Sequence, residues 1–209
     1  MSLMDKAGCR IYLIRHGETA NAKEQALNGH FDVALSSKGE DQIRAVANAL
    51  QDRPVRAVYS SDLKRTRASA DIVSQPHKLK PVCYPELREL SFGAWEGLSL
   101  AELNRKYPGE VAKRFKNPDT FQAKGGETFR QLRERVLPRF HEIVGRHPAE
   151  EIIIMGHGGV NRVILGHLLG IPFSNIFRIA QENAGINILQ YYNDDPIIEL
   201  INGVPRQLL

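Results

Sequence analysis

Two histidines stand directly after apolar runs, in segments that lie far apart in the sequence. His16 follows the apolar run 11–14 after Arg15, and His157 follows the run 151–155 after a single glycine. Each run predicts a buried strand. In open α/β sheets, ligands bind outside the carboxyl ends of the strands. The pair therefore predicts one site that contains two imidazoles, although either histidine alone could equally pack beside a strand.

Arg15 adjoins His16 at the expected strand end, and Gly17 begins a turn behind them. We expect the chain to turn helical there, so that backbone N–H groups point at the same spot, an arrangement that suits phosphate. An unprotonated imidazole can attack phosphorus and form a phosphohistidine. It must present one bare nitrogen, so the other should donate to a backbone carbonyl or a carboxylate.

A second cation is expected from the segment 62–67, which opens a helix just after a predicted strand. Arg65 and Arg67 are two residues apart and cannot share a helix face. Arg65 lies in the first turn, near the strand end, and is predicted to face the site. There its guanidinium would bind two phosphate oxygens at once. Arg67 is predicted to be a surface charge.

The segment 86–93 supplies candidate general acids, because phosphoryl transfer from an ester requires a proton for the leaving oxygen. A glutamate in a partly desolvated pocket holds that proton if burial raises its pKa more than neighbouring cations lower it. The residue types alone do not decide between Glu86 and Glu89.

Strand and helix signals alternate along the chain. Strands are expected at 9–15, 56–59, 81–84 and 151–155, followed by a hairpin of 186–192 and 197–201 with its turn at 193–196. Helices are expected at 37–50, from a capping-box start at Ser37, at 62–73 behind a cap formed by 60–62, and at 99–106, 127–146 and 161–169. Pro138 should kink the long helix. The pattern predicts an α/β fold, a three-layer αβα sandwich around a mostly parallel central sheet.

The chain has 209 residues, a net charge of +4 and a pI of about 9.1. Its length predicts one domain, 9–209, behind a disordered or tag-derived segment 1–8. A basic balance fits nucleic acid, an anionic membrane or a small anionic substrate. The basic residues form no long run, which argues against nucleic acid, and no apolar run approaches membrane-spanning length. Two cysteines without a paired motif predict reduced thiols in a cytoplasmic protein. Nothing indicates an oligomer.

Four segments together resemble the histidine phosphatase superfamily, also called the phosphoglycerate mutase-like family. They follow its order and spacing, and the match spans nearly the whole chain. The segments are Arg15–Thr19, Ser60–Thr66, Glu89–Gly93 and Gly156–Gly159. The resemblance implies a phosphoglycerate mutase-like fold, with 9–209 as a single histidine phosphatase domain and 95–125 as a lid.

The resemblance also implies roles for the site residues. His16 would be the phosphorylated nucleophile, and His157 the second imidazole that binds the phosphoryl group and stabilises its charge. Glu89 would act as general acid and later as the base that activates water. Members of the family work without a metal, and this chain shows no His, Asp and Glu cluster at metal-ligand spacing. We expect this chain to need no cofactor. Phosphate contacts are implied for Arg15, Arg65, His157 and Gly158.

One position departs from the family. An asparagine often stands six residues after the nucleophile and helps to hold phosphate, but here that position is Ala22. Either Asn21 reaches the phosphate through a shifted loop, or Asn28 and water take its place.

The resemblance favours the phosphatase branch over the mutases. Mutases carry arginine directly after the catalytic glutamate and a longer insertion, whereas here Leu90 follows Glu89 and the segment 95–125 is short. The segment 92–99 resembles α-ribazole phosphatases and broad-specificity phosphatases. We therefore expect a metal-independent phosphomonoesterase for a small phosphorylated metabolite such as α-ribazole phosphate. The alternatives are a cofactor-dependent phosphoglycerate mutase and a catalytically silent phosphate-binding module.

Residues around the expected pocket are less clearly assigned. His30 and Phe31 lie in the first loop, which borders the pocket in this family, so either could touch substrate. The aromatic residues of the lid, Tyr107, Phe115 and Phe121, are expected to pack the lid onto the sheet rather than stack on substrate.

Overall fold

A six-stranded mixed sheet forms the centre of the computed structural model, which describes residues 8–192 and 195–205. The strands are β1 Cys9–Arg15, β2 Val55–Ser60, β3 Val82–Cys83, β4 Glu151–Gly156, β5 Ile186–Tyr192 and β6 Asp195–Gly203. Their order across the sheet is β3-β2-β4-β1-β5-β6. The first four strands are parallel, and the expected hairpin, β5 and β6, adds an antiparallel pair beside β1. The mostly parallel sheet is confirmed.

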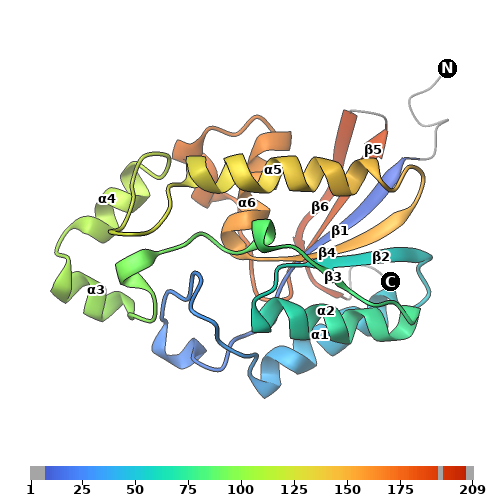
Figure 1. Cartoon of the computed structure of the whole chain (residues 1–209), viewed down its shortest axis with the longest axis horizontal. Coiled ribbons are helices and arrows are strands. Elements are labelled where there is room, and N and C mark those ends of the chain that lie inside the picture. Colours follow the sequence, from blue (N-terminus) through green and yellow to red (C-terminus); the bar gives the residue numbers. More distant parts are fainter. Residues whose placement is uncertain (1–7, 193–194, 206–209) are drawn as a thin grey trace.

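Helices cover both faces of the sheet (Figure 1). On one face, α1 Ser37–Leu50 and α2 Lys64–Ser74 pack on Tyr12, Ile14 and Ile153. On the other face, α5 Phe129–Gly145 and α6 Gly158–Leu168 pack on Ile11, Leu13, Ile152 and Ile154 of β1 and β4. These side chains alternate along the strands with those on the first face. The three-layer sandwich is confirmed, because side chains on either face of the sheet are buried under helices.

Two further helices, α3 Leu100–Lys106 and α4 Glu110–Lys116, lie at one end of the molecule, away from the sheet (Figure 1). Ser99 caps α3 in a capping box with Glu102, as its sequence position predicts. Helix α4 is not among the elements predicted from the sequence. Short 3₁₀ segments connect the larger elements at Ala22–Glu24, Gln75–His77, Pro85–Leu87, Gly93–Trp95 and Phe173–Arg178.

The register between β1 and β4 sets the position of the site. The two strands pair in parallel, and Arg15 lies opposite Gly156. The residues that follow, His16 and His157, therefore leave the sheet at the same edge. The pairing of β1 with β4 thus brings His16 and His157 together although they are distant in sequence, as the two apolar runs predict.

Some expected helix starts are wrong. The α1 cap is Ser36, whose hydroxyl accepts the Gly39 N–H, and not Ser37. Helix α2 begins at Lys64 without a side-chain cap, because its N-cap residue, Leu63, has an apolar side chain that cannot accept a hydrogen bond. Helix α6 begins at Gly158, three residues earlier than expected.

Other expectations have mixed outcomes. The chain does not turn helical after Gly17 but continues as a loop to the 3₁₀ segment at 22–24. Helix α5 begins at Phe129 behind a capping box and runs on through Pro138. The N-terminal segment 1–7 and turn residues 193–194 lie outside the described residues.

We predict that Gly39→Ala destabilises the protein by about 1–3 kcal/mol, because the first turn of α1 packs directly on the loop behind His16. A Cβ atom at Gly39 would lie 2.0 Å from the Glu18 carbonyl oxygen. This oxygen belongs to the backbone, so the clash cannot be relieved by a change of side-chain rotamer. Gly145→Ala is the matched control, since a Cβ atom at this position on α5 meets nothing within 4 Å. Urea denaturation measures both, and equal unfolding free energies for the two variants would contradict the packing argument.

Candidate active site

A cavity of about 420 Å³ opens where β1 and β4 end. It is bordered by the loop 25–29, the N-terminus of α6 and residues of α4. Its lining includes most of the predicted site residues: Arg15, His16, Asn28, Arg65, Glu89 and Gly158. The fold therefore gathers these side chains from five separate segments at one place.

His16 has the protonation state that a nucleophile needs. Its Nδ1 lies 2.7 Å from the Gly17 carbonyl oxygen, and since a carbonyl can only accept, Nδ1 carries the proton. Nε2 is then the bare nitrogen. Burial lowers the pKa of His16 well below its usual value, and the charges of Arg15 and Arg65 lower it further. The imidazole is thus neutral, with its free lone pair on Nε2.

His157 stands beside it, with the two ring centroids 5.2 Å apart at an interplanar angle of 68°. It is fully buried at the N-cap of α6, and its Nε2 lies 2.8 Å from the Ser61 hydroxyl. Its Nδ1 has no hydrogen-bond partner among the described residues. Burial, then Arg65, lowers the pKa of His157 well below its usual value. The sequence predicts Ser61 only as part of a helix cap, and this contact with His157 is not apparent from it.

Two arginines flank the histidines. Arg65 is 1% exposed, and its guanidinium donates to the carbonyls of Gly29 and Phe31 at 2.6 and 3.0 Å. Arg15 donates to the Gln181 carbonyl, and its Nε is buried without a hydrogen-bond partner in the described chain. Burial lowers the pKa of both arginines. Arg67 is exposed, as its helix position predicts.

The choice between the two glutamates follows from their contacts. Both carboxylate oxygens of Glu89 accept the Gly159 N–H, at 3.0 and 3.1 Å, in the first turn of α6. A Cβ atom at position 159 would lie 2.3 Å from a Glu89 oxygen, so this approach requires glycine. Glu86 instead forms an ion pair with Arg139 on α5 and does not line the cavity. Glu89 is therefore the carboxylate of the site.

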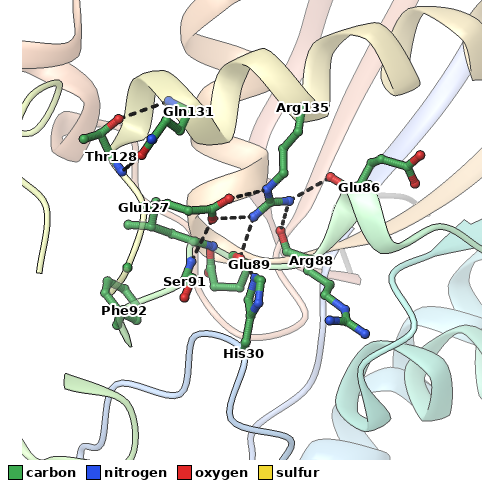
Figure 2. A network of polar contacts seen from close by, with 12 residues as sticks. His30, Glu86, Arg88, Glu89, Ser91, Phe92, Glu127, Thr128, Gln131 and Arg135 are labelled. Atoms are coloured by element: carbon green, nitrogen blue, oxygen red, sulfur yellow. Dashed lines mark hydrogen bonds and ion pairs between the residues drawn. The ribbon is translucent and has the colours of Figure 1, made fainter. Parts of the chain in front are cut away.

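Arg135 of α5 holds the backbone that carries Glu89 (Figure 2). Its guanidinium donates to three carbonyls at 2.8 Å each, those of Glu86, Arg88 and Glu89. It also donates to both carboxylate oxygens of Glu127. The ion pair of Arg135 with Glu127, which lies just before α5, thus fixes the backbone around Glu89. Sequence reasoning missed both residues, since nothing local marks an arginine that binds distant carbonyls.

His30, which the sequence suggests as a pocket residue, instead contacts the backbone that carries Glu89 (Figure 2). Its Nε2 lies 2.8 Å from the Glu89 carbonyl oxygen, and it is absent from the cavity lining. The Glu96 carboxylate accepts the N–H groups of His30 and Phe92, which joins the first loop to the loop after Glu89. Phe31 is exposed and bonds Arg65 through its carbonyl.

The two candidate replacements for the family asparagine bond each other. The Asn21 side-chain nitrogen donates to the Asn28 side-chain oxygen at 2.7 Å, and the reverse bond measures 3.1 Å. Asn28 and Ala22 line the cavity, whereas Asn21 stands behind Asn28. A phosphate contact by Asn28 therefore remains a prediction, with Asn21 as the residue that orients its amide.

The distal part of the cavity contains residues that the sequence did not reveal. Arg114 of α4 and Arg162 of α6 line it together with Phe115, Phe129 and Phe177. Phe115 therefore borders the pocket, in addition to packing on Phe177. As expected, the other two lid aromatics pack inward, because Tyr107 and Phe121 both contact the Trp95 ring.

Within residues 8–192 and 195–205, no three His, Cys, Asp or Glu side chains gather as potential metal ligands. The same residues include no helix with the length and apolar character to cross a membrane.

The two neutral imidazoles predict a specific pH dependence of stability. Both folded-state pKa values lie below the unfolded value of about 6.5, so the unfolded chain takes up two extra protons as the pH falls. Their contribution is complete above pH 6.5 and is lost below it, at about 1.4 kcal/mol per pH unit for each histidine. The double variant His16→Asn/His157→Asn should therefore lose unfolding free energy more slowly below pH 6.5 than the wild type. Urea titrations at several pH values test this.

His167→Asn, which removes an exposed histidine of α6, serves as the control and should keep the wild-type dependence. Parallel pH curves for the wild type and the double variant would show that the two imidazoles are not held neutral.

Known proteins with similar sequences and structures include phosphatases and a mutase. A metal-independent phosphoserine phosphatase of Arabidopsis thaliana is 35% identical over 193 residues, which cover 90% of this chain and 79% of that protein. A probable phosphoglycerate mutase of Cronobacter sakazakii is 27% identical over 182 residues, covering 87% and 85%. The α-ribazole phosphatase structure from Shigella flexneri superposes with a TM-score of 0.84 at 24% identity, covering 93% and 96%.

The family itself follows from a match over nearly the whole described chain. The sequence model of the histidine phosphatase superfamily (branch 1) matches residues 11–203, a range that contains both strand ends, Glu89 and the segment 95–125. Together with the paired imidazoles and the αβα sandwich, this match shows that the chain belongs to the histidine phosphatase superfamily.

Proposed function

We propose that this protein is a metal-independent phosphomonoesterase that acts through a phosphohistidine on His16. The observation that supports this most is the neutral imidazole of His16, which presents its Nε2 beside two buried arginines in a cavity of small-metabolite size. A neutral imidazole is a competent nucleophile toward phosphorus, and the arginines neutralise the negative charge that would otherwise repel it.

The reaction proceeds in two displacements. In the first, His16 Nε2 forms a bond to phosphorus, the ester P–O bond breaks, and Glu89 gives its proton to the leaving alcohol oxygen. In the second, ionised Glu89 takes a proton from water as the water oxygen attacks phosphorus. The P–N bond breaks, and inorganic phosphate leaves. Arg15, Arg65 and His157 hold the phosphoryl oxygens during both steps.

Two alternatives predict different products. A mutase would return the phosphoryl group to a bound intermediate and interconvert phosphoglycerates without net release of phosphate. A silent binding module would bind phosphate without turnover. The complete set of two histidines, two clamp arginines and a carboxylate favours chemistry over mere binding, and the short segment 95–125 favours hydrolysis.

We predict that the wild type releases phosphate in EDTA from at least one member of a panel that includes α-ribazole phosphate, 3-phosphoglycerate and an aryl phosphate. His16→Ala should reduce this release by at least about 10³-fold, because alanine has no nitrogen that could attack phosphorus. His167→Ala, on the exposed side of α6, is the control and should retain full activity. Interconversion of phosphoglycerates without phosphate release would establish the mutase instead, and EDTA-sensitive release would refute metal independence.

The acid role of Glu89 predicts a dependence on the leaving group. Glu89→Gln should slow phosphorylation of the enzyme by alkyl phosphates about 10²–10⁴-fold, because an alkoxide cannot leave without a proton. Nitrophenyl phosphate should be affected much less in this step, since its phenolate leaves unprotonated. Burst kinetics separate phosphorylation from hydrolysis of the phosphohistidine. An equal loss in phosphorylation with both kinds of substrate would assign Glu89 another role.

A further inference from the structure

The cavity carries more positive charge than a phosphomonoester can neutralise. Among the described residues, its charged lining consists of four arginines and one glutamate, a net charge of +3: Arg15, Arg65, Glu89, Arg114 and Arg162. A phosphomonoester contributes about −1.5 to −2 at neutral pH. At least about one positive charge therefore remains without a partner after the reacting phosphate is bound, and about two remain when Glu89 carries the proton that it gives to the leaving group.

Arg114 is the charge with the weakest support from the protein. Its guanidinium carbon lies between 4.9 and 5.8 Å from the ring centroids of Phe92, Phe115, Phe129 and Phe177. Among the described residues it has neither a hydrogen bond nor an ion pair. Burial lowers its pKa to about 10. Aromatic faces hold such a cation in place but leave its N–H groups unbonded.

Arg162 connects this cage to the reaction centre. A Cβ atom at Gly158 would lie 3.1 Å from an Arg162 nitrogen and 3.6 Å from Arg15 Nε, so the two guanidinium groups are neighbours. Arg162 is anchored through its Nε and Nη1 to the carbonyls of Ile179 and Gly158. The charge of Arg162 in turn lowers the pKa of Arg114. The cations thus form a series that leads away from the reacting phosphate.

We propose that Arg114 and Arg162 bind a carboxylate of the substrate, so that the natural substrate is a small phosphomonoester with a carboxylate a few bonds from the ester oxygen. This substrate class rests on the proposed phosphatase function. A carboxylate supplies negative charge that the lining lacks, and its two oxygens match the edge of a guanidinium. A substrate whose remaining part is uncharged, such as α-ribazole phosphate, offers the Arg114 N–H groups no anionic partner.

The test compares two substrates that differ in one group. 3-Phosphoglycerate carries a carboxylate where glycerol 3-phosphate carries a hydroxymethyl group, and phosphate release from each gives kcat/KM. We expect the wild type to prefer 3-phosphoglycerate at least about tenfold, and Arg114→Gln to lower that preference at least about tenfold. Lys113→Gln, an exposed neighbour on α4 outside the cavity lining, is the matched control and should keep the wild-type preference. An equal loss with both substrates, or no preference in the wild type, overturns the proposal.

Calorimetric binding separates this proposal from the phosphatase proposal. In the His16→Ala background, which cannot be phosphorylated at that residue, 3-phosphoglycerate should bind at least about tenfold more tightly than glycerol 3-phosphate, and Arg114→Gln should abolish the difference. This result would support the carboxylate site even if the wild type released no phosphate. Equal affinities for both compounds would refute it even if the enzyme proved to be a phosphatase.

Discussion

The parallel pairing of β1 with β4 determines where both histidines lie, and the other site residues are arranged around them. Because Arg15 pairs with Gly156, the next residues leave the sheet side by side. A register shift of one residue would separate the imidazoles and turn the buried side chains of a strand to the opposite face. Both strands are packed under helices on both faces, so the core that stabilises the fold also fixes this register.

The site combines buried neutral bases with buried cations, two conditions that support each other. The arginines lower the affinity of the imidazoles for protons, which keeps a lone pair available on His16. An anionic ligand in turn relieves the cost of holding several guanidinium groups away from water. An anionic ligand therefore gains binding free energy in this cavity that an uncharged ligand of the same shape does not gain.

The sequence alone located the strand ends, His16, His157 and the inward arginine of the pair at 65 and 67, because these depend on local patterns. It failed where a role depends on tertiary contact. The sequence predicts Ser61 as part of a helix cap, yet its hydroxyl contacts His157, which follows the neighbouring strand. Arg135 binds carbonyls far away in sequence, which no residue pattern encodes. The Ser36 cap was missed by one position because two serines adjoin, and only the backbone angles distinguish them.

The charged side chain that α4 contributes to the cavity is held differently from the residues at the strand ends. The histidines and the carboxylate are fixed by the sheet, α6 and the Arg135 contacts, whereas Arg114 stands on a peripheral seven-residue helix and touches the body through ring faces. Aromatic contacts tolerate changes in sequence better than the directional bonds around Glu89 do. Exchange of the segment around α4 would therefore change the far wall of the cavity and leave the contacts that position His16, His157 and Glu89 in place.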